Sequence, residues 1–318
     1  MNHPAHSLPA LSPAAAWSIT GEPVEHVEPL GDGTRSRVFL VTLSDGDERV
    51  VKLLPRGSGR VEREAWVRGR LAGCPPFPTL SEVVVPPDRH GLDADVTLSR
   101  RAHAEPMAAA LARGDDRECL PLWSAFGEGL AALHGISPRG FGLLDGAGQG
   151  STTTWREAMS AVSRAALDLA RRTPLDDLCD AAERSLLALA PALDAVRAPR
   201  LLHGDAQPRN VLVRGPRLVA WLDLEFASGG DPLYETAFVA GCFEGDDPRR
   251  GMRWLEAFAE GYTRRGALDD APDRARYYGI VHALRAAEYL SVVGPSLGSE
   301  AMARAVSAAR GSLSRWLP

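Results

Sequence analysis

Residues 201–213, LLHGDAQPRNVLV, carry the arrangement on which the interpretation of this sequence depends. An apolar run ends at HGD, and a short predicted strand, VLV, follows directly. The chain then turns through RGPR and returns as a second predicted strand, LVAWLD, which ends at Asp223. This pattern places Asp205 and Asn210 on one short loop, and it places Asp223 at the end of the strand that returns to that loop.

Upstream of this loop, the sequence divides into a strand-rich part and a helical part. Residues 25–54 alternate short apolar runs with glycine and aspartate turns, which predicts strands joined by tight turns. From residue 60 the period becomes helical, and the apolar stripe of RVEREAWVRGRLAG includes Glu64. An acid on an apolar stripe needs a partner, because an unpaired charge is costly to bury.

The predicted fold class is α+β, with a small β-rich N-lobe on a larger helical C-lobe. Two further strand-like runs follow the first helix, and amphipathic helices dominate after residues 100–105. We therefore expect an N-terminal extension over residues 1–24, the N-lobe over residues 25–102, and the C-lobe over residues 103–318.

Composition narrows the class of protein. The chain has 318 residues and a formal net charge of −5, with 24% charged and 45% hydrophobic residues. These values exclude a disordered chain and a miniature disulfide scaffold. Because the net charge is negative, the protein lacks the general positive potential that attracts nucleic acid. The four cysteines lack metal-site spacing, and the sequence shows no convincing signal peptide or membrane span. We expect a cytoplasmic protein that binds neither nucleic acid nor membranes.

Two residues stand out against the composition. Lys52 is the only lysine among 36 lysine and arginine residues, and Asn210 is the only asparagine apart from Asn2. Codons rich in G and C explain the general scarcity of both residue types. A residue that persists against this bias is a candidate for a role that arginine or aspartate does not fill, since lysine carries a compact point charge and arginine a planar fork.

Four features occur in a fixed order. They are a glycine turn between two strands (GDGTRS, 31–36), Lys52 on the following strand, Glu64 on the next helix, and the HGD…N…D group. Phosphoryl transfer from ATP needs a loop over the phosphates, a cation on them, magnesium ligands, and a carboxylate near the attacking hydroxyl. The sequence supplies a candidate for each requirement.

The spacing within the last group supports the same chemistry. Asp205 and Asn210 are five residues apart, which is the D-x-x-x-x-N spacing of a kinase catalytic loop. In that geometry the carboxylate faces the substrate hydroxyl and the amide oxygen faces a metal. Asp223 would supply a second, negatively charged magnesium ligand, and Lys52 would hold the α- and β-phosphates and pair with Glu64.

These motifs resemble those of the aminoglycoside phosphotransferase-like kinases, which include choline kinase-like enzymes. LLHGDAQPRNVLV followed by LDLEFASGGDPLYE is similar to the family's HGDxHxxN, D-x-[ED] and GDPxxD elements, and the resemblance covers residues 28–290. It implies a two-lobe, protein-kinase-like fold with MgATP in the cleft. It also implies that Asp205 is the catalytic carboxylate and that Asn210 and Asp223 are the magnesium ligands. The nucleotide-binding residues that it implies are Lys52, Glu64, Gly31, Gly33 and Ser36.

Three positions depart from the family pattern. Gln207 stands where a second histidine is frequent, and we expect it to tune activity because glutamine still donates and accepts hydrogen bonds. Ser36 stands where many relatives carry asparagine in the glycine turn. Glu235 replaces a frequent aspartate after GDP, and we expect a structural or substrate-side role for it.

The acceptor is expected to be a small molecule. Only seven residues separate Asp223 from Asp231, which is too few for an activation loop or a peptide platform. From residue 237 onward there are ten acids and eleven arginines, so no acidic surplus for a polycation is visible. Glu244, Asp246 and Asp247 could form a local acidic wall, or they could belong to a solvated loop.

We therefore expect an ATP-dependent O-phosphotransferase that uses Mg²⁺, with GTP as an alternative donor. Its acceptor would be a hydroxyl of an antibiotic or related natural product, in resistance or self-protection. One alternative is a metabolite kinase for choline, a sugar or an amino-alcohol, and another is an inactive nucleotide-binding pseudokinase. Its partner would be a hydroxylated small molecule, and the protein would be a monomer or a homodimer.

Some local roles stay open at this point. Glu64 could pair with Lys52 or with Arg68 one helical turn away. Glu225 could reach the metal or cap a neighbouring turn. His134, near a predicted helix C-terminus, is expected to cap that helix.

Overall fold

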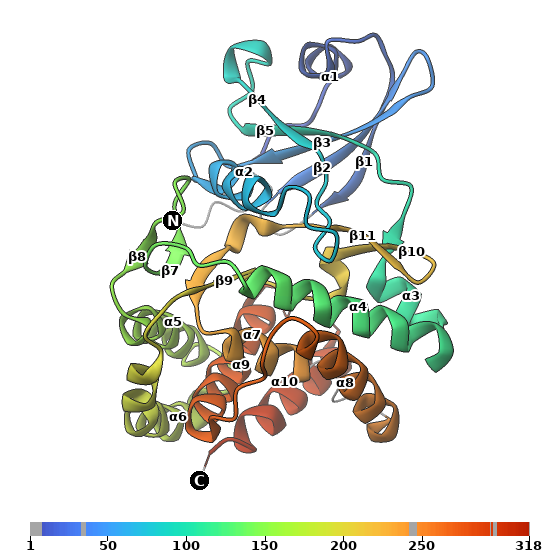
Figure 1. The fold of residues 1–318 in the computed structure, drawn as a ribbon. Coiled ribbons are helices and arrows are strands. Elements are labelled where there is room, and N and C mark those ends of the chain that lie inside the picture. Colours follow the sequence, from blue (N-terminus) through green and yellow to red (C-terminus); the bar gives the residue numbers. More distant parts are fainter. Residues whose placement is uncertain (1–7, 33–35, 242–246, 293, 295–297, 318) are drawn as a thin grey trace.

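The N-lobe is built on one antiparallel sheet. The computed structural model describes residues 8–32, 36–241, 247–292, 294 and 298–317. The sheet has the strand order β1-β2-β3-β5-β4 and lies at the top of Figure 1. The elements of this lobe are α1 (Pro13–Thr20), β1 (Val24–Asp32), β2 (Arg37–Leu43), β3 (Glu48–Leu54), α2 (Arg60–Leu71), β4 (Glu82–Val85), the 3₁₀ turn η2 (Pro87–Arg89) and β5 (Asp95–Arg100).

The alternation of side chains along β3 gives the sheet two different faces. Val51 and Leu53 are fully buried in a core that also contains Ile19 of α1. Lys52 lies between them in sequence and pairs with Val38 and Thr97 of the neighbouring strands. Because successive strand residues point to opposite faces, Lys52 projects away from this core, towards α2 and the C-lobe.

The segment ahead of β1 packs onto the sheet. Ser12 accepts a hydrogen bond from the backbone N–H of Ala15 and so caps α1, and a left-handed glycine, Gly21, ends the helix. Leu8, Ala16 and Ile19 are buried with the strands. Residues 8–20, which we predicted as part of an extension, thus contribute to the N-lobe core.

The α2 helix has the stripe predicted from its sequence. Val61, Glu64, Val67 and Leu71 are all buried, at spacings of three and four residues. The helix contacts the 3₁₀ turn η5 (Leu224–Phe226) of the C-lobe as well as β4 and β5. Glu64 is therefore placed where the two lobes meet.

The C-lobe is mostly helical and contains two small sheets, with strand orders β11-β10-β6 and β8-β7-β12-β9. Together with the N-lobe, this gives the whole chain the predicted α+β fold of two lobes. The elements of the C-lobe, besides η5, are β6 (Glu105–Pro106), α3 (Met107–Arg113), α4 (Asp116–His134), β7 (Phe141–Leu144), β8 (Gly150–Thr152), α5 (Trp155–Ala170), α6 (Asp176–Leu189), η3 (Ala190–Ala195), β9 (Arg200–Leu202), η4 (Pro208–Asn210), β10 (Val211–Arg214), β11 (Arg217–Trp221), β12 (Ser228–Gly230), α7 (Pro232–Gly241), α8 (Pro248–Thr263), α9 (Pro272–Val292) and α10 (Ser299–Ser314).

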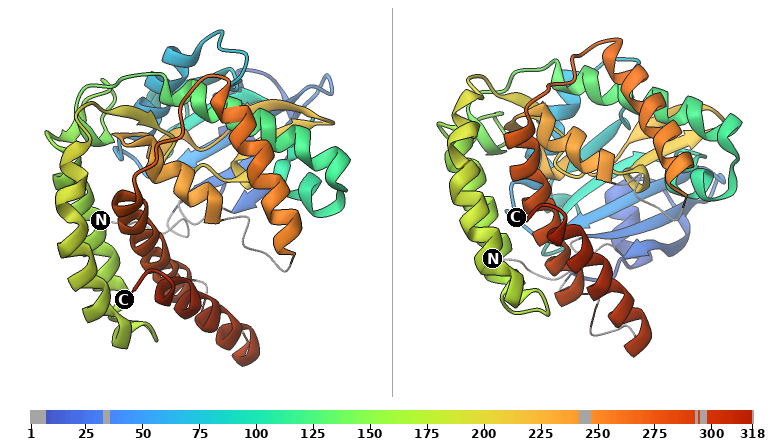
Figure 2. Two further views of the ribbon diagram at one scale, coloured as in Figure 1. Left: turned by 60° about the horizontal axis from the view of Figure 1, so that its bottom comes forward. Right: turned by 90° about the horizontal axis from the view of Figure 1, so that it is seen from below.

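Two hydrophobic cores hold this lobe together. The first joins α4 and α8 to the β10–β11 hairpin, and in it Trp221 stacks on Phe77 with ring centroids 4.6 Å apart. The helices α4 and α8 approach closely at Gly261, where a Cβ atom would lie 1.9 Å from the carbonyl oxygen of Ser124. The second core joins α5, α6, α9 and α10, which lie side by side in Figure 2. No helix within the described residues is long and apolar enough to cross a membrane.

Candidate active site

The HGDAQPRN loop connects β9 to β10 and folds back on itself. Asn210 Nδ2 donates to the backbone oxygen of Asp205 at 2.9 Å and to its Oδ2 at 2.8 Å. Gln207 donates to the other carboxylate oxygen, and Arg209 Nη2 lies 3.1 Å from Oδ2. The buried His203 accepts the Asp205 backbone N–H at 3.3 Å through Nδ1. The structure thus brings Asp205 and Asn210 into direct contact.

Glu235 on α7 holds the start of this loop. Its carboxylate accepts the backbone N–H groups of His203 at 2.9 Å and Gly204 at 2.6 Å. His134 Nε2 lies 3.0 Å from the same carboxylate, and its Nδ1 lies 2.7 Å from the hydroxyl oxygen of Tyr262. The expected helix-capping role of His134 is therefore wrong, since both of its ring nitrogens face buried side chains and not the helix carbonyls. Glu235, in turn, has a structural role.

Lys52 lies at the centre of a cluster of carboxylates. Its Nζ lies 3.2 Å from Glu64 Oε1, 2.8 Å from Asp223 Oδ1 and 3.2 Å from Glu225 Oε2. The other oxygen of Glu225 accepts a hydrogen bond from Arg60 Nη1 at 3.1 Å. Residues from β3, α2 and the β11–η5 junction therefore converge on one ammonium group.

The two partners considered for Glu64 both bind it. Lys52 contacts Oε1, and Arg68 Nη1 donates to Oε2 at 3.0 Å. Glu64 is only 2% exposed, so both of its oxygens are paired where solvent cannot reach them.

The cluster shifts the pKa values of its members. Burial alone would lower the pKa of Lys52, but the charges of Glu64, Asp223 and Glu225 raise it well above its usual value. Burial would raise the pKa of Asp223, yet the charge and hydrogen bond of Lys52 keep it below its usual value. For Glu225, burial prevails over the Lys52 charge and raises the pKa. Lys52 therefore remains protonated and Asp223 ionised at neutral pH.

The backbone at Asp223 is left-handed. Its φ of 57° and ψ of 47° make it the only non-glycine residue with positive φ in the described part of the chain. A conformation of this kind costs roughly 1–3 kcal/mol and tends to occur where a side chain must be aimed at a site. The preceding residue, Leu222, donates its N–H to Asn210 O at 2.8 Å, which ties Asp223 to the catalytic-loop candidate.

Arg63, which the sequence did not single out, connects α2 to the C-lobe. Its guanidinium is buried and donates to the backbone oxygen of Glu225 at 2.5 Å and to that of Leu144 on β7. These carbonyls belong to two C-lobe segments that also border the site. Arg63 thereby fixes the helix that carries Glu64.

The glycine-turn candidates lie at the β1–β2 connection. Gly31 in β1 pairs with Val38 of β2, and Ser36 immediately precedes β2. Gly33 lies outside the described residues.

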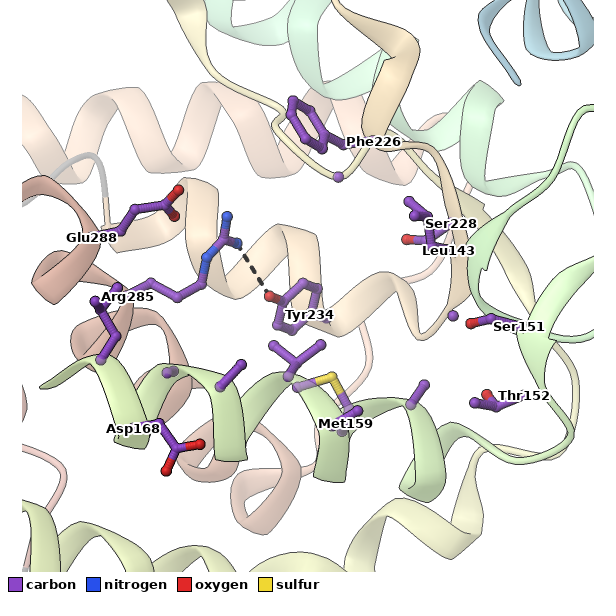
Figure 3. A pocket seen from close by; sticks show the side chains of 18 of the residues that line it. Leu143, Ser151, Thr152, Met159, Asp168, Phe226, Ser228, Tyr234, Arg285 and Glu288 are labelled. Carbon is purple, nitrogen blue, oxygen red and sulfur yellow. Dashed lines mark hydrogen bonds between the residues drawn. The ribbon is translucent and has the colours of Figure 1, made fainter. Parts of the chain in front are cut away.

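Two cavities are lined by residues of this region or next to it. The smaller, of about 370 Å³, lies between the N-lobe sheet and the β10–β11 hairpin. Its lining includes Val38, Val50, Lys52, Leu212, Trp221 and Asp223. The larger, of about 940 Å³, lies within the C-lobe and is bordered by Gly204 and Phe226 (Figure 3). The residue before Asp205 therefore lines one cavity, and Lys52 and Asp223 line the other.

The donor set suits a hard divalent cation. Mg²⁺ prefers oxygen ligands, and carboxylate oxygens of Glu64, Asp223 and Glu225 lie within 4.8 Å of one another. Asn210 adds an amide oxygen on the adjacent loop, since its Nδ2 is already bonded to Asp205. Arg60 and Lys52 lie next to the two oxygens of Glu225, but Lys52 makes no hydrogen bond to Oε2. Asp223, whose side chain is 45% exposed, and Asn210 are the metal ligands that the sequence predicts.

The acidic-wall alternative falls largely outside the described residues, which include neither Glu244 nor Asp246. Asp247 caps α8 by accepting the backbone N–H groups of Arg249 and Arg250. Asp231, the acid of the GDP motif, accepts hydrogen bonds from Tyr278 at 2.7 Å and Arg274 at 2.6 Å, and so joins α7 to α9.

Comparison with known proteins gives one family. The model of the phosphotransferase enzyme family, APH, matches residues 26–279. No curated protein sequence matches the chain.

Solved structures of this kind share the fold. A thermostable mutant of the aminoglycoside phosphotransferase APH(4)-Ia, in a ternary complex with ADP and hygromycin B, has a TM-score of 0.69 and 20% identity over 96% of this chain and 98% of that one. The macrolide 2′-phosphotransferase MphH from Brachybacterium faecium has a TM-score of 0.59 and 17% identity over 94% and 96%. The ADP-bound aminoglycoside phosphotransferase APH(2″)-Ib has a TM-score of 0.61 and 16% identity over 96% and 99%.

Proposed function

The chain belongs to the phosphotransferase enzyme family and is a small-molecule kinase, and we propose that it transfers the γ-phosphoryl group of ATP to a hydroxyl group of an antibiotic or related natural product. The similarity in fold to aminoglycoside and macrolide phosphotransferases supports this acceptor class. In this proposal, residues 25–102 bind the nucleotide, and residues 103–318 hold the catalytic loop and the acceptor pocket.

One observation carries the proposal. Asp205 and Asn210 bond to each other on a loop whose Gly204 lines the larger cavity, and Lys52 and Asp223, paired at 2.8 Å, line the smaller one. A nucleotide in the smaller cavity and an acceptor in the larger one would meet at this loop. Such an arrangement positions the reactants for in-line transfer, in which positioning and charge stabilisation supply most of the catalysis.

Each residue of the site has a role in the transfer. Asp205 orients the acceptor hydroxyl and takes its proton as the oxygen attacks the γ-phosphorus, while the bond to the β,γ-bridging oxygen breaks and ADP leaves. Lys52 neutralises phosphate charge, and Glu64 keeps it in place. Asp223 and Asn210 would hold Mg²⁺, which neutralises phosphate charge when bound. Glu235 and Arg63 keep the loop and α2 in position.

The test is ADP release by the purified protein, with ATP and with GTP, against a panel of hydroxylated antibiotics and metabolites. Asp205→Asn is expected to lower kcat by about 10²–10⁴-fold and to leave binding of a fluorescent ATP analogue unchanged. Asp194→Asn is the matched control, because Asp194 is exposed and pairs with Arg156 at the surface. A fall of less than tenfold in Asp205→Asn would overturn the catalytic assignment. Nucleotide binding without turnover on any compound would favour a pseudokinase.

A further inference from the structure

The larger cavity is walled mainly by apolar side chains. One stripe of α5 supplies much of the wall, at spacings of three and four residues. These residues are Trp155, Ala158, Met159, Val162, Ala166 and Leu169. Val162 is 38% exposed although it is a large apolar residue, and it borders the cavity. A volume of about 940 Å³ lies at the upper end of the range for drug-sized ligands.

The charged groups of this cavity balance one another. Among the described lining residues there are two acids, Asp168 and Glu288, and two arginines, Arg172 and Arg285. Arg285 extends from α9 into the space above α5, where its Nη1 donates to the hydroxyl of Tyr234 at 3.3 Å (Figure 3). The pKa of Arg285 is raised chiefly by Tyr234, and the charges of Glu288 and Asp205 act in the same direction.

A second arginine lies against Asp205 itself. Arg209 Nη2 is 3.1 Å from Asp205 Oδ2, and its side chain is 63% exposed. The proposed acceptor site therefore has one arginine in the cavity lining, Arg285, and one in contact with Asp205, Arg209. An acceptor that carries several ammonium groups would bring like charges towards both arginines, and like-charge juxtaposition opposes binding.

We propose that the larger cavity selects a hydroxylated acceptor with an extended apolar surface and at most one positive charge, an inference that rests on the proposed function. In this proposal Arg285 excludes polycationic sugars. The apolar stripe of α5 would bind the apolar surface of the acceptor by removing it from water. Polar groups near the loop, which include the Tyr234 hydroxyl, would orient the end that carries the reactive hydroxyl. Arg285 is then a residue that determines specificity.

The first test measures binding and does not depend on turnover. The probe is 8-anilinonaphthalene-1-sulfonate, which combines apolar rings with one negative charge and fluoresces when removed from water. Wild-type protein is expected to bind it, and Val162→Asp is expected to weaken binding at least tenfold. The matched control is Leu187→Asp, which makes the same type of change at a residue of α6 that is 70% exposed and outside the cavity lining. Equal binding by wild type and Val162→Asp would overturn the proposal.

The second test reverses the charge of Arg285. Kanamycin, a polycationic sugar, should fail to displace the probe from wild-type protein at millimolar concentration, whereas a macrolactone with one amine, such as erythromycin, should displace it. Arg285→Glu should gain at least tenfold in kanamycin affinity and lose probe affinity. Arg164→Glu reverses an exposed charge of α5 outside the cavity lining and should change neither. Micromolar kanamycin binding to wild type that Arg285→Glu leaves unchanged would refute the role of Arg285.

Turnover separates this proposal from the function on which it rests. ADP release with kanamycin in preference to apolar hydroxylated compounds would refute the acceptor class and leave the kinase assignment intact. Probe binding that behaves as expected, together with no ADP release on any acceptor, would instead refute the proposed activity and retain the ligand chemistry of the cavity.

Discussion

Glu235→Gln is the most informative single substitution, because it removes one charge and preserves the shape of a buried side chain. In the wild type, the carboxylate accepts two backbone N–H groups of the catalytic-loop candidate and contacts His134. Glutamine keeps one acceptor oxygen, and its amide nitrogen must face at least one of these donors. The substitution therefore breaks charged hydrogen bonds that solvent cannot replace.

The expected magnitude follows from these contacts. A hydrogen bond to a charged group contributes about 1.5–3 kcal/mol, so the loss of one to two such bonds should lower the free energy of unfolding by about 3 kcal/mol. The loop would also lose part of its restraint, and we expect kcat to fall at least tenfold. The KM for ATP should change less than twofold, because Glu235 does not line the smaller cavity.

Urea unfolding followed by tryptophan fluorescence measures the first effect, and steady-state ADP release measures the second. Glu260→Gln is the control, since Glu260 has a 73% exposed side chain and bonds to Arg264 on the same helix; it should change stability by less than about 0.5 kcal/mol. An unfolding free energy of Glu235→Gln within about 0.5 kcal/mol of wild type, with kcat unchanged, would refute the reasoning.

Three further outcomes are expected. Arg63→Leu should lower the free energy of unfolding, measured by urea titration, by about 3–5 kcal/mol, because two buried carbonyls lose a charged donor. The control Arg164→Leu, at an exposed position, should change it by less than about 0.5 kcal/mol. Lys52→Met should lower kcat/KM for ATP by about 10²–10³-fold, measured by ADP release, because it removes the cation that we propose for the phosphates. An unchanged value would contradict that role. The folded-state pKa of Glu235 lies below its usual value, since the hydrogen bond and charge of His134 outweigh burial. The ionised Glu235 therefore contributes to stability above its unfolded pKa of about 4.3, and this contribution is lost as the pH falls through the folded pKa. In acid titrations, the difference in unfolding free energy between wild type and Glu235→Gln should shrink below about pH 4.

The features that the sequence predicted well are those set by local spacing. The stripe of α2 predicted the burial of Glu64, because it depends only on the period of that helix. The expected partner of Glu64, Lys52, lies 3.2 Å from it. The five-residue separation of Asp205 and Asn210 placed them in contact within one loop. These predictions needed only the spacing of residues within one helix or one loop.

The contacts that escaped prediction join residues distant in the chain. His134 and Glu235 are 101 residues apart, and nothing in the sequence around His134 distinguishes a buried partner from a helix cap. Arg63 was hidden by composition, because one arginine among 35 carries no signal of its own. Its position next to Glu64 on a helix that meets the C-lobe was the only available clue. The position of Arg285 in the larger cavity likewise depends on how α9 packs against α5.

The anchoring of α2 by Arg63 has a consequence for how the cell can control this protein. In protein kinases, regulation acts by moving the corresponding helix and its glutamate towards or away from the lysine. Here a buried guanidinium joins that helix to two main-chain oxygens of the other lobe, and the Glu64 contact with Lys52 is already formed. The contact between Lys52 and Glu64 therefore needs no further movement of α2, so a signal that acted by bringing this helix inward would have nothing to change.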